Sequence, residues 1–168
     1  TEPEVALQGQ SPEYFFQHST IAALSRDLPA GMLLVVKETY EAIGRRPKNF
    51  YRQLRDFKNV VLLSPLELGL NVVRQASAVA TICSTVGFEA AVLGKPVIVF
   101  GQHSLYEFLP HVHVIHGYNE LKPALSAALS EDFDTEKAQS DGQKFLSTVM
   151  DTSFDMKDCD HIDPKKFD

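Results

Sequence analysis

The chain has 168 residues, 44% of them hydrophobic and 23% charged, which is typical of one globular domain with its own core. Its net charge of −6 argues against nucleic acid as a partner, because phosphate backbones require clustered Lys and Arg; Arg45, Arg46 and Lys48 are the one local exception. No apolar run approaches the length of a membrane span, and Cys83 and Cys159 are expected to be free thiols in a reducing, cytoplasmic compartment.

Strand and helix patterns alternate along the chain. Short apolar runs predict strands over residues 5–8, 32–36, 59–63, 78–82, 96–100 and 113–115. Helical spacing predicts helices over residues 12–27, 47–56, 70–75, 86–93, 121–129 and 136–150. Ser11 is expected to cap the first helix, with Pro12 at its first position. The run 32–36 is five apolar residues long, which favours a strand covered on both faces.

This alternation predicts an α/β fold, a three-layer α/β/α sandwich around a mostly parallel, Rossmann-like sheet of about six strands. Residues 1–150 are expected to form this domain. Residues 151–168 are rich in Asp and poor in large apolar side chains, which predicts an acidic, flexible tail. Because the sequence starts Thr-Glu-Pro-Glu without an initiator Met, we expect it to be a piece of a longer chain.

The stretch 81–101 contains the strongest candidate site. A strand ends at Cys83-Ser84-Thr85, a helix follows, and a second strand ends at Gly101. Ligands of open α/β sheets bind at the carboxyl ends of strands, and a helix start offers free N–H groups to an anion such as phosphate. Ser84 and Thr85 are therefore either a plain helix cap or a phosphate seat. Glu89, one turn further, either faces solvent or accepts hydrogen bonds from vicinal hydroxyls such as those of a ribose.

Charged residues follow the strand at 32–36. Lys37 and Glu38 form either a surface ion pair of little energetic value or part of the same crevice. Arg45 and Arg46 are either solvated loop residues or a clamp on a phosphate or a carboxylated sugar.

The histidines between 103 and 116 are close in sequence, and His111 and His113 would share one strand face. No Asp, Glu or Cys completes a ligand set at a suitable spacing, so we expect no metal site. His103 and Tyr106, just past Gly101, are better placed for binding. The tail residues Cys159 and His161 belong to a solvated acidic terminus. No Gly-x-Gly-x-x-Gly, Walker A or Gly-x-Ser-x-Gly sequence occurs, which disfavours nicotinamide binding, P-loop chemistry and a hydrolase triad.

Several motifs occur in a characteristic order: Lys37-Glu38, the loop Gly44-Arg-Arg-Pro followed by Phe-Tyr51, Thr81-Ile-x-Ser-Thr-Val-Gly-Phe-Glu-Ala90, and Gly94-Lys-Pro with the strand after it and Tyr106. Together they resemble the C-terminal, donor-binding half of GT-B-fold glycosyltransferases of bacterial surface polysaccharide. The most similar group is the capsule polysaccharide synthesis family, which includes Kdo transferases. The resemblance covers residues 5–129.

The resemblance implies a nucleotide-sugar donor, expected to be CMP-linked, as substrate, and no separate cofactor. Ser84 and Thr85 match the family's phosphate-facing turn, Glu89 matches its carboxylate near the ribose, and Lys37 and Glu38 match the Lys-Glu before its His-Pro pair. The implied partners are the N-terminal GT-B half of the parent chain, a glycan acceptor and, peripherally, the inner membrane.

The chain departs from the family pattern at Thr39-Tyr40, which replaces His-Pro. Thr39 can donate a hydrogen bond to a donor phosphate but brings no positive charge. Two alternatives therefore stay open: a catalytically inactive GT-B-like binding or assembly module, and half of a sugar-nucleotide epimerase. The isolated domain is expected to bind nucleotide weakly without turnover.

Overall fold

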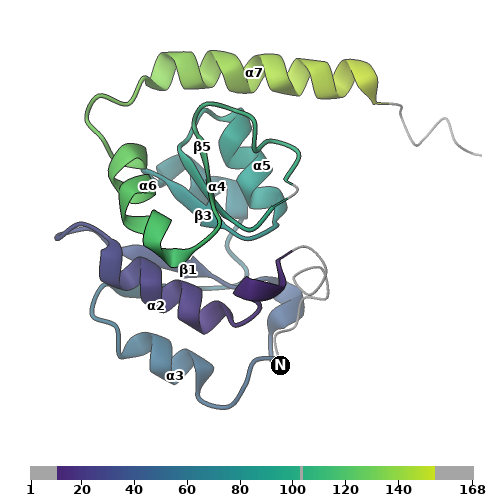
Figure 1. Cartoon of the computed structure of the whole chain (residues 1–168). Coiled ribbons are helices and arrows are strands. Elements are labelled where there is room, and N and C mark those ends of the chain that lie inside the picture. Colours follow the sequence, from purple (N-terminus) through teal and green to yellow (C-terminus); the bar gives the residue numbers. More distant parts are fainter. Residues whose placement is uncertain (1–10, 103, 154–168) are drawn as a thin grey trace, which may run out of the picture.

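The computed structural model describes residues 11–102 and 104–153, in which helices and strands alternate from α2 to β4 (Figure 1). The strands are β1 (Leu34–Lys37), β2 (Val60–Leu63), β3 (Val79–Thr81), β4 (Val97–Phe100) and β5 (Val112–Ile115). The α-helices are α2 (Gln17–Asp27), α3 (Phe50–Arg55), α4 (Gly69–Gln75), α5 (Thr85–Val92), α6 (Leu121–Ala128) and α7 (Thr135–Thr152). Three short 3-10 helices are η1 (Pro12–Tyr14), η2 (Tyr40–Ala42) and η3 (Tyr118–Glu120).

Every strand pair in the described residues is parallel, which confirms the α/β prediction. The strands nevertheless form two sheets, β1–β2 and β3–β4–β5, with no ladder from β1 to β3. The prediction of one sheet of about six strands is therefore wrong for the described residues, which contain five strands. The strand expected over residues 5–8 lies outside the described part of the chain.

The second sheet is the centre of a three-layer sandwich. All four residues of β4 are buried, and successive side chains point to opposite faces of the sheet. Val97 and Val99 pack in one core with side chains of α4, α5 and α7. Ile98 and Phe100 pack in the other core with side chains of α2 and α6. The predicted α/β/α layering is thus confirmed around β4.

The first sheet is covered on one face only. Leu34 reaches the core shared with α2, and α3 packs against β2. On the other face Val35 and Val61 are paired in register and are 44% and 39% exposed, and Leu33 beside them is exposed too. The expectation that 32–36 is covered on both faces is therefore wrong, because no described helix packs on this face.

The chain enters the described region at the carboxyl ends of β4 and β5. Ser11 is buried against Gly101, where the Ser11 side chain leaves no room for a Cβ, and the Tyr14 hydroxyl donates to the Ile115 carbonyl at 3.0 Å. Ser11 makes no side-chain capping bond, and Pro12 starts a 3-10 turn, not the α-helix. The long helix begins only at Gln17, so the predicted cap and helix start are corrected here.

Helix α7 lies across the end of the molecule opposite α3 (Figure 1). It packs on α5 at Gly142, where an added Cβ would lie 2.5 Å from the carbonyl oxygens of Ala91 and Val92. The helix predicted over 136–150 is confirmed, and it continues two residues past the expected domain boundary, to Thr152.

Candidate functional site

The turn between β3 and α5 has the form that the sequence predicts. Ser84 and Thr85 are exposed, with Ser84 extended at φ −104° and ψ 157° and Thr85 the first residue of α5. The Ser84 side chain does not cap the helix; its Oγ lies 2.7 Å from Thr81 Oγ1 instead. Within the described residues, no hydrogen bond uses the N–H groups of Thr85 and Val86. The turn therefore presents hydroxyls and two available N–H donors at a strand carboxyl end.

Glu89 lies one turn into α5 and is half-buried. Its carboxylate has no hydrogen-bond or ion-pair partner among the residues that the structure describes. The helix around it is tightly packed, since Gly87, Ala90 and Ala91 are buried against the core. An unpaired carboxylate in this position retains its full capacity to accept hydrogen bonds from a ligand.

Tyr106 packs over the same turn. It is buried, and its hydroxyl reaches toward the Ser84 carbonyl at 3.5 Å, at the limit of a hydrogen bond. An added Cβ on Gly87 would collide with that hydroxyl and lie 2.7 Å from Thr81 Cγ2. Burial raises the pKa of Tyr106, so its hydroxyl stays protonated. The side chain therefore packs directly against the turn.

Lys37 ends β1 and is half-buried. Its ammonium donates to two carbonyl oxygens, of Glu38 at 3.3 Å and of Pro65 at 3.4 Å, which links the carboxyl ends of β1 and β2. No carboxylate among the described residues neutralises it. Its positive charge is therefore not compensated by an acidic partner within the described residues.

Glu38 pairs with Arg46 and not with Lys37. Two parallel bonds of 2.6 Å join the guanidinium to the carboxylate, and the side chains are only 5% and 11% exposed. The guanidinium also lies 4.8 Å from the ring centre of Phe50, and Tyr51 donates to Glu38 at 3.2 Å. This bidentate pair fastens the loop between β1 and α3 to the end of β1.

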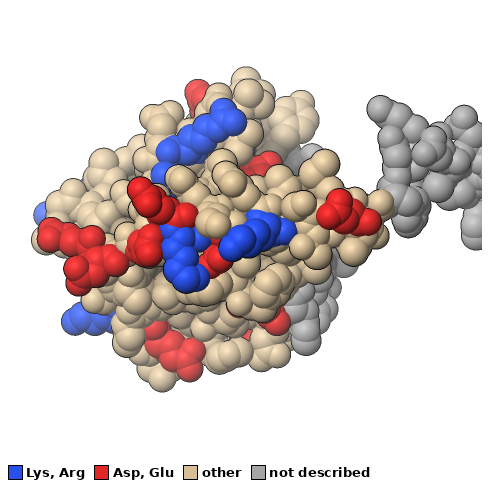
Figure 2. Space-filling model, turned by 90° about the horizontal axis from the view of Figure 1, so that it is seen from above, with Lys and Arg blue, Asp and Glu red and all other residues tan. Residues whose placement is uncertain are grey.

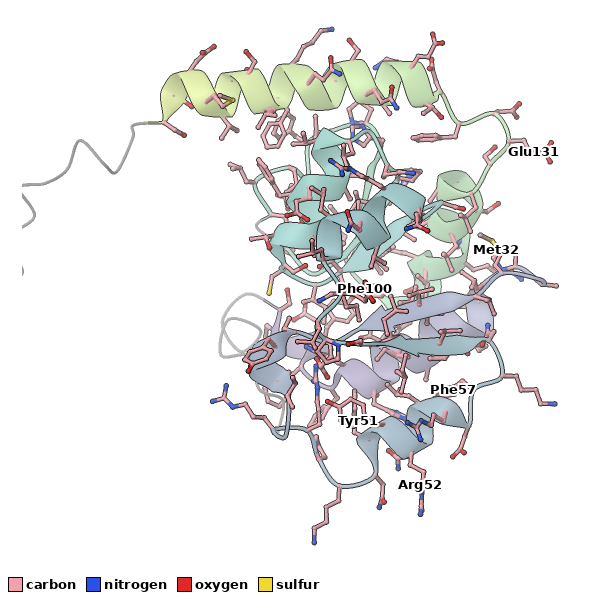
Figure 3. The ribbon with its side chains drawn as sticks, turned by 180° about the vertical axis from the view of Figure 1, so that it is seen from behind. Met32, Tyr51, Arg52, Phe57, Phe100 and Glu131 are labelled. Atoms are coloured by element: carbon pink, nitrogen blue, oxygen red, sulfur yellow. The ribbon has the colours of Figure 1, made fainter. Side chains whose placement is uncertain are left out.

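Tyr51 belongs to this network, although it is not among the candidate site residues predicted from the sequence. Burial and the Glu38 carboxylate raise the pKa of Tyr51. The Phe-Tyr pair occurs in the motif that carries the resemblance, but its position at the start of a helix is typical of packing alone, so the sequence assigned no role to the Tyr51 hydroxyl. Figure 3 labels Tyr51 on α3, beneath the first sheet.

The other candidates on this loop, Thr39 and Arg45, are exposed, and neither side chain makes a hydrogen bond or ion pair with another described residue. The structure thus brings the nine candidates into two groups. Ser84, Thr85, Glu89 and Tyr106 gather around the start of α5. The remaining five lie at the end of β1 and on the loop that follows it: Lys37, Glu38, Thr39, Arg45 and Arg46. No hydrogen bond within the described residues joins the two groups.

The histidines that the sequence raised as metal ligands have other environments. His111 is buried with its Nε2 2.8 Å from the Ala91 carbonyl, and its Nδ1 has no partner in the described residues. Burial, and secondarily His111, lowers the pKa of His113. No group of three His, Cys, Asp or Glu in ranges 11–102 and 104–153 is arranged to hold a metal ion. His103, Cys159 and His161 lie outside the described residues.

A surface hollow lies at the amino ends of the strands, between Met32 and Glu131 (Figure 3). Ser77 before β3 and Pro96 before β4 also line it. None of the residues that line it is a Lys or Arg that could bind an anion. Open α/β sheets bind ligands at the opposite, carboxyl ends of their strands. The hollow is therefore separate from the candidate site.

These observations describe an α/β domain with a polar turn and an uncompensated cation at strand carboxyl ends. A family described as "Capsule polysaccharide biosynthesis protein" matches residues 17–109, just over half of the chain. The chain belongs to this family. All nine candidate residues lie inside the matched range, whereas β5, α6 and α7 lie beyond it. No curated protein and no solved structure matches the chain.

None of the described helices combines the length and the apolar composition that crossing a bilayer requires. Cys83, at the start of the β3–α5 turn, forms no disulfide with another described residue.

Proposed function

We propose that this chain is the donor-binding half of a GT-B-fold glycosyltransferase that binds a nucleotide-sugar in the synthesis of bacterial capsular polysaccharide. Family membership supports the pathway. The observation that carries the binding proposal is the exposed Ser84-Thr85 turn, with two N–H groups unused by described residues and the unpaired carboxylate of Glu89 one turn away.

The chemistry of this turn suits the diphosphate or phosphate of a nucleotide-sugar. The N–H groups of Thr85 and Val86 and the positive end of the α5 dipole attract an anion, and the two hydroxyls add donors. As the sugar leaves, charge grows on the nucleotide phosphate, and the same groups stabilise it electrostatically. Glu89 then accepts hydrogen bonds from the ribose hydroxyls.

Two cations from the candidate group at the end of β1 complete the proposed phosphate site. Lys37 has only carbonyl partners in the described residues, and Arg45 is exposed on the loop that follows β1. Arg46 is held by Glu38, so in this proposal it orders the loop and Arg45 is the arginine that meets phosphate. We place the donor in a CMP-linked form, following the Kdo-transferase resemblance.

Exposed leucines suggest where the N-terminal half would lie. Leu66 and Leu68 follow β2, Leu105 follows β4, and all three side chains are largely exposed. These loops lie past the carboxyl ends of their strands, where the proposed donor site is. A second domain facing this edge would cover the leucines, enclose the donor and bring the glycan acceptor and the catalytic base.

Thr39 gives a specific reason to keep a second candidate, a binding module without turnover. The exposed Thr39 stands where the resemblance implies a histidine, and it supplies no charge to a phosphate. Such a module would still bind the donor. Radiolabelled CMP-Kdo with the full parent enzyme separates the two, because the module binds the donor and transfers no sugar.

Equilibrium binding of CMP and CMP-Kdo by calorimetry tests the proposal on the chain itself. We expect millimolar or tighter binding that weakens about tenfold in Glu89→Ala, since a lost hydrogen bond to a charged group has about this effect. Glu136→Ala, which removes an exposed carboxylate on α7, is the matched control and should bind normally. Equal affinities of the two variants would contradict the assignment of Glu89.

A further inference from the structure

The segment 45–58 is strongly basic in an acidic protein. It contains six Lys and Arg residues and one Asp, whereas the whole chain carries a net charge of −6. Arg46 is held by Glu38. The other five cations are exposed, and none makes an ion pair with a described residue: Arg45, Lys48, Arg52, Arg55 and Lys58. The proposed nucleotide site accounts for Arg45 alone.

The backbone that carries these cations is firmly held. Phe50 and Leu54 bury α3 against the domain, and the Glu38–Arg46 pair fastens the loop before it. Arg52 extends from α3 away from the sheet (Figure 3). The cations therefore stand on a fixed surface, and their charges add without a large ordering cost.

Large apolar side chains adjoin this basic surface. Tyr40 is 68% exposed and Ile43 is 50% exposed on the loop that leads into it, and Tyr51 on α3 is partly exposed. Gly44, at φ +75°, turns the chain between Ile43 and Arg45. A soluble polyanion would be attracted by the cations alone and offers nothing to an exposed Ile and Tyr.

We propose that Tyr40, Ile43 and the basic segment 45–58 form a docking surface for an anionic lipid bilayer. Lys and Arg gather at the negative leaflet surface, Tyr lies at the level of the head groups, and Ile enters the acyl boundary. The face at the other end of the molecule, over α7, carries acidic and basic side chains together, so it presents no continuous basic surface to a lipid (Figure 2). The surface would hold the enzyme beside the membrane with α3 toward the lipid.

Co-sedimentation with vesicles tests this docking surface. The protein should bind vesicles of phosphatidylcholine with 30% phosphatidylglycerol (a typical test composition, of order one anionic lipid in three), and it should bind pure phosphatidylcholine far more weakly. Binding to the anionic vesicles should fall steeply as salt rises from about 50 to 500 mM, because the attraction is screened.

Charge variants locate the surface. Lys48→Gln, Arg52→Gln and Arg55→Gln together should weaken vesicle binding about a hundredfold, at roughly fivefold for each cation near an anionic surface. The matched control removes three exposed cations elsewhere, with Arg74→Gln, Lys122→Gln and Lys144→Gln, and should bind nearly as the parent does. None of the six is in the proposed nucleotide site, so nucleotide affinity reports on that proposal separately.

The apolar contribution has its own pair of variants. Ile43→Ser should weaken vesicle binding about tenfold, whereas Leu33→Ser, on the uncovered face of the first sheet, should not. Thermal unfolding confirms that each variant is folded.

Three results would overturn the proposal: equal binding to neutral and anionic vesicles, equal loss in the two triple variants, or salt-dependent binding to dextran sulfate with no vesicle binding. The last would identify the basic segment as a site for a soluble polyanion.

Discussion

At the scale of single residues, the best-defined contact near the candidate site is the ion pair between Arg46 and Glu38. Both side chains are nearly buried, so removing one partner leaves the other charge without compensation. We expect Arg46→Ala to lower the free energy of unfolding by about 3–5 kcal/mol in urea titrations. The double variant Glu38→Gln/Arg46→Met should lose much less. A cost below about 1 kcal/mol for Arg46→Ala would show that the pair is open to solvent.

Gly87 is required by the side chain that packs on it. A Cβ at this position would collide with the Tyr106 hydroxyl and approach Thr81 Cγ2 to 2.7 Å. We expect Gly87→Ala to destabilise the protein by about 1–3 kcal/mol, measured by thermal unfolding. In a Tyr106→Phe background the same change should cost less, because the hydroxyl is gone. An equal cost in both backgrounds would place the strain elsewhere.

His113 is expected to make stability depend on pH. Burial, and then the nearby His111, holds its pKa below the ordinary value of 6.5 in the folded chain. The unfolded chain therefore binds the proton more readily, and stability is lost as pH falls below 6.5 toward the folded pKa. His113→Asn should flatten the fall in unfolding free energy between about pH 7 and 5. A titration of His113 by NMR at or above 6.5 would contradict this.

The sequence could predict some of these residue-level features and not others. Ser84, Thr85 and Glu89 follow from a local pattern, an apolar strand run followed at once by a helix, so their positions were predictable. The partner of Glu38 was not, because Arg46 lies eight positions away, across a connection that contains only one short 3-10 helix and no strand or α-helix pattern. From the sequence, Arg46 was either a solvated loop residue or a clamp on phosphate, whereas in the structure its guanidinium pairs with Glu38.

At the scale of elements, β1 and β4 look alike in sequence and differ in burial. Both are apolar runs, but Val35 in β1 is 44% exposed whereas Val99 in β4 is fully buried. We expect Val99→Ala to cost about 2 kcal/mol or more and Val35→Ala well under 1 kcal/mol, by urea unfolding. Comparable costs would mean that the outer face of the first sheet is covered in solution.

The comparison of β1 with β4 also shows why the strands could be predicted from the sequence, whereas the helices that pack on each of their faces could not. An apolar run of four or five residues marks a strand whichever faces are buried. Cover depends on which helices the crossovers bring to each face, and that is a property of the tertiary fold. The same reason explains why a single six-stranded sheet was expected and two sheets are found. Periodicity indicates where strands lie, but it does not show whether β1 pairs with β3.

At the scale of the whole molecule, two separate regions of different character carry the two proposals. The turn before α5 has the donors and the unpaired carboxylate that suit a nucleotide-sugar, and the segment 45–58 has the cations and exposed apolar side chains that suit a lipid surface. Together they support an enzyme half that works beside a membrane and faces a second domain through Leu66, Leu68 and Leu105.

The most direct test of the central proposal is a map of amide chemical shifts as the chain is titrated with CMP, UDP, GDP and CMP-Kdo. We expect shifts centred on Ser84, Thr85 and Glu89, with a second group at Lys37, that saturate with CMP-Kdo and need about tenfold more ligand in Glu89→Ala. No shift at millimolar nucleotide, or shifts gathered around the hollow at Met32 and Glu131, would contradict it.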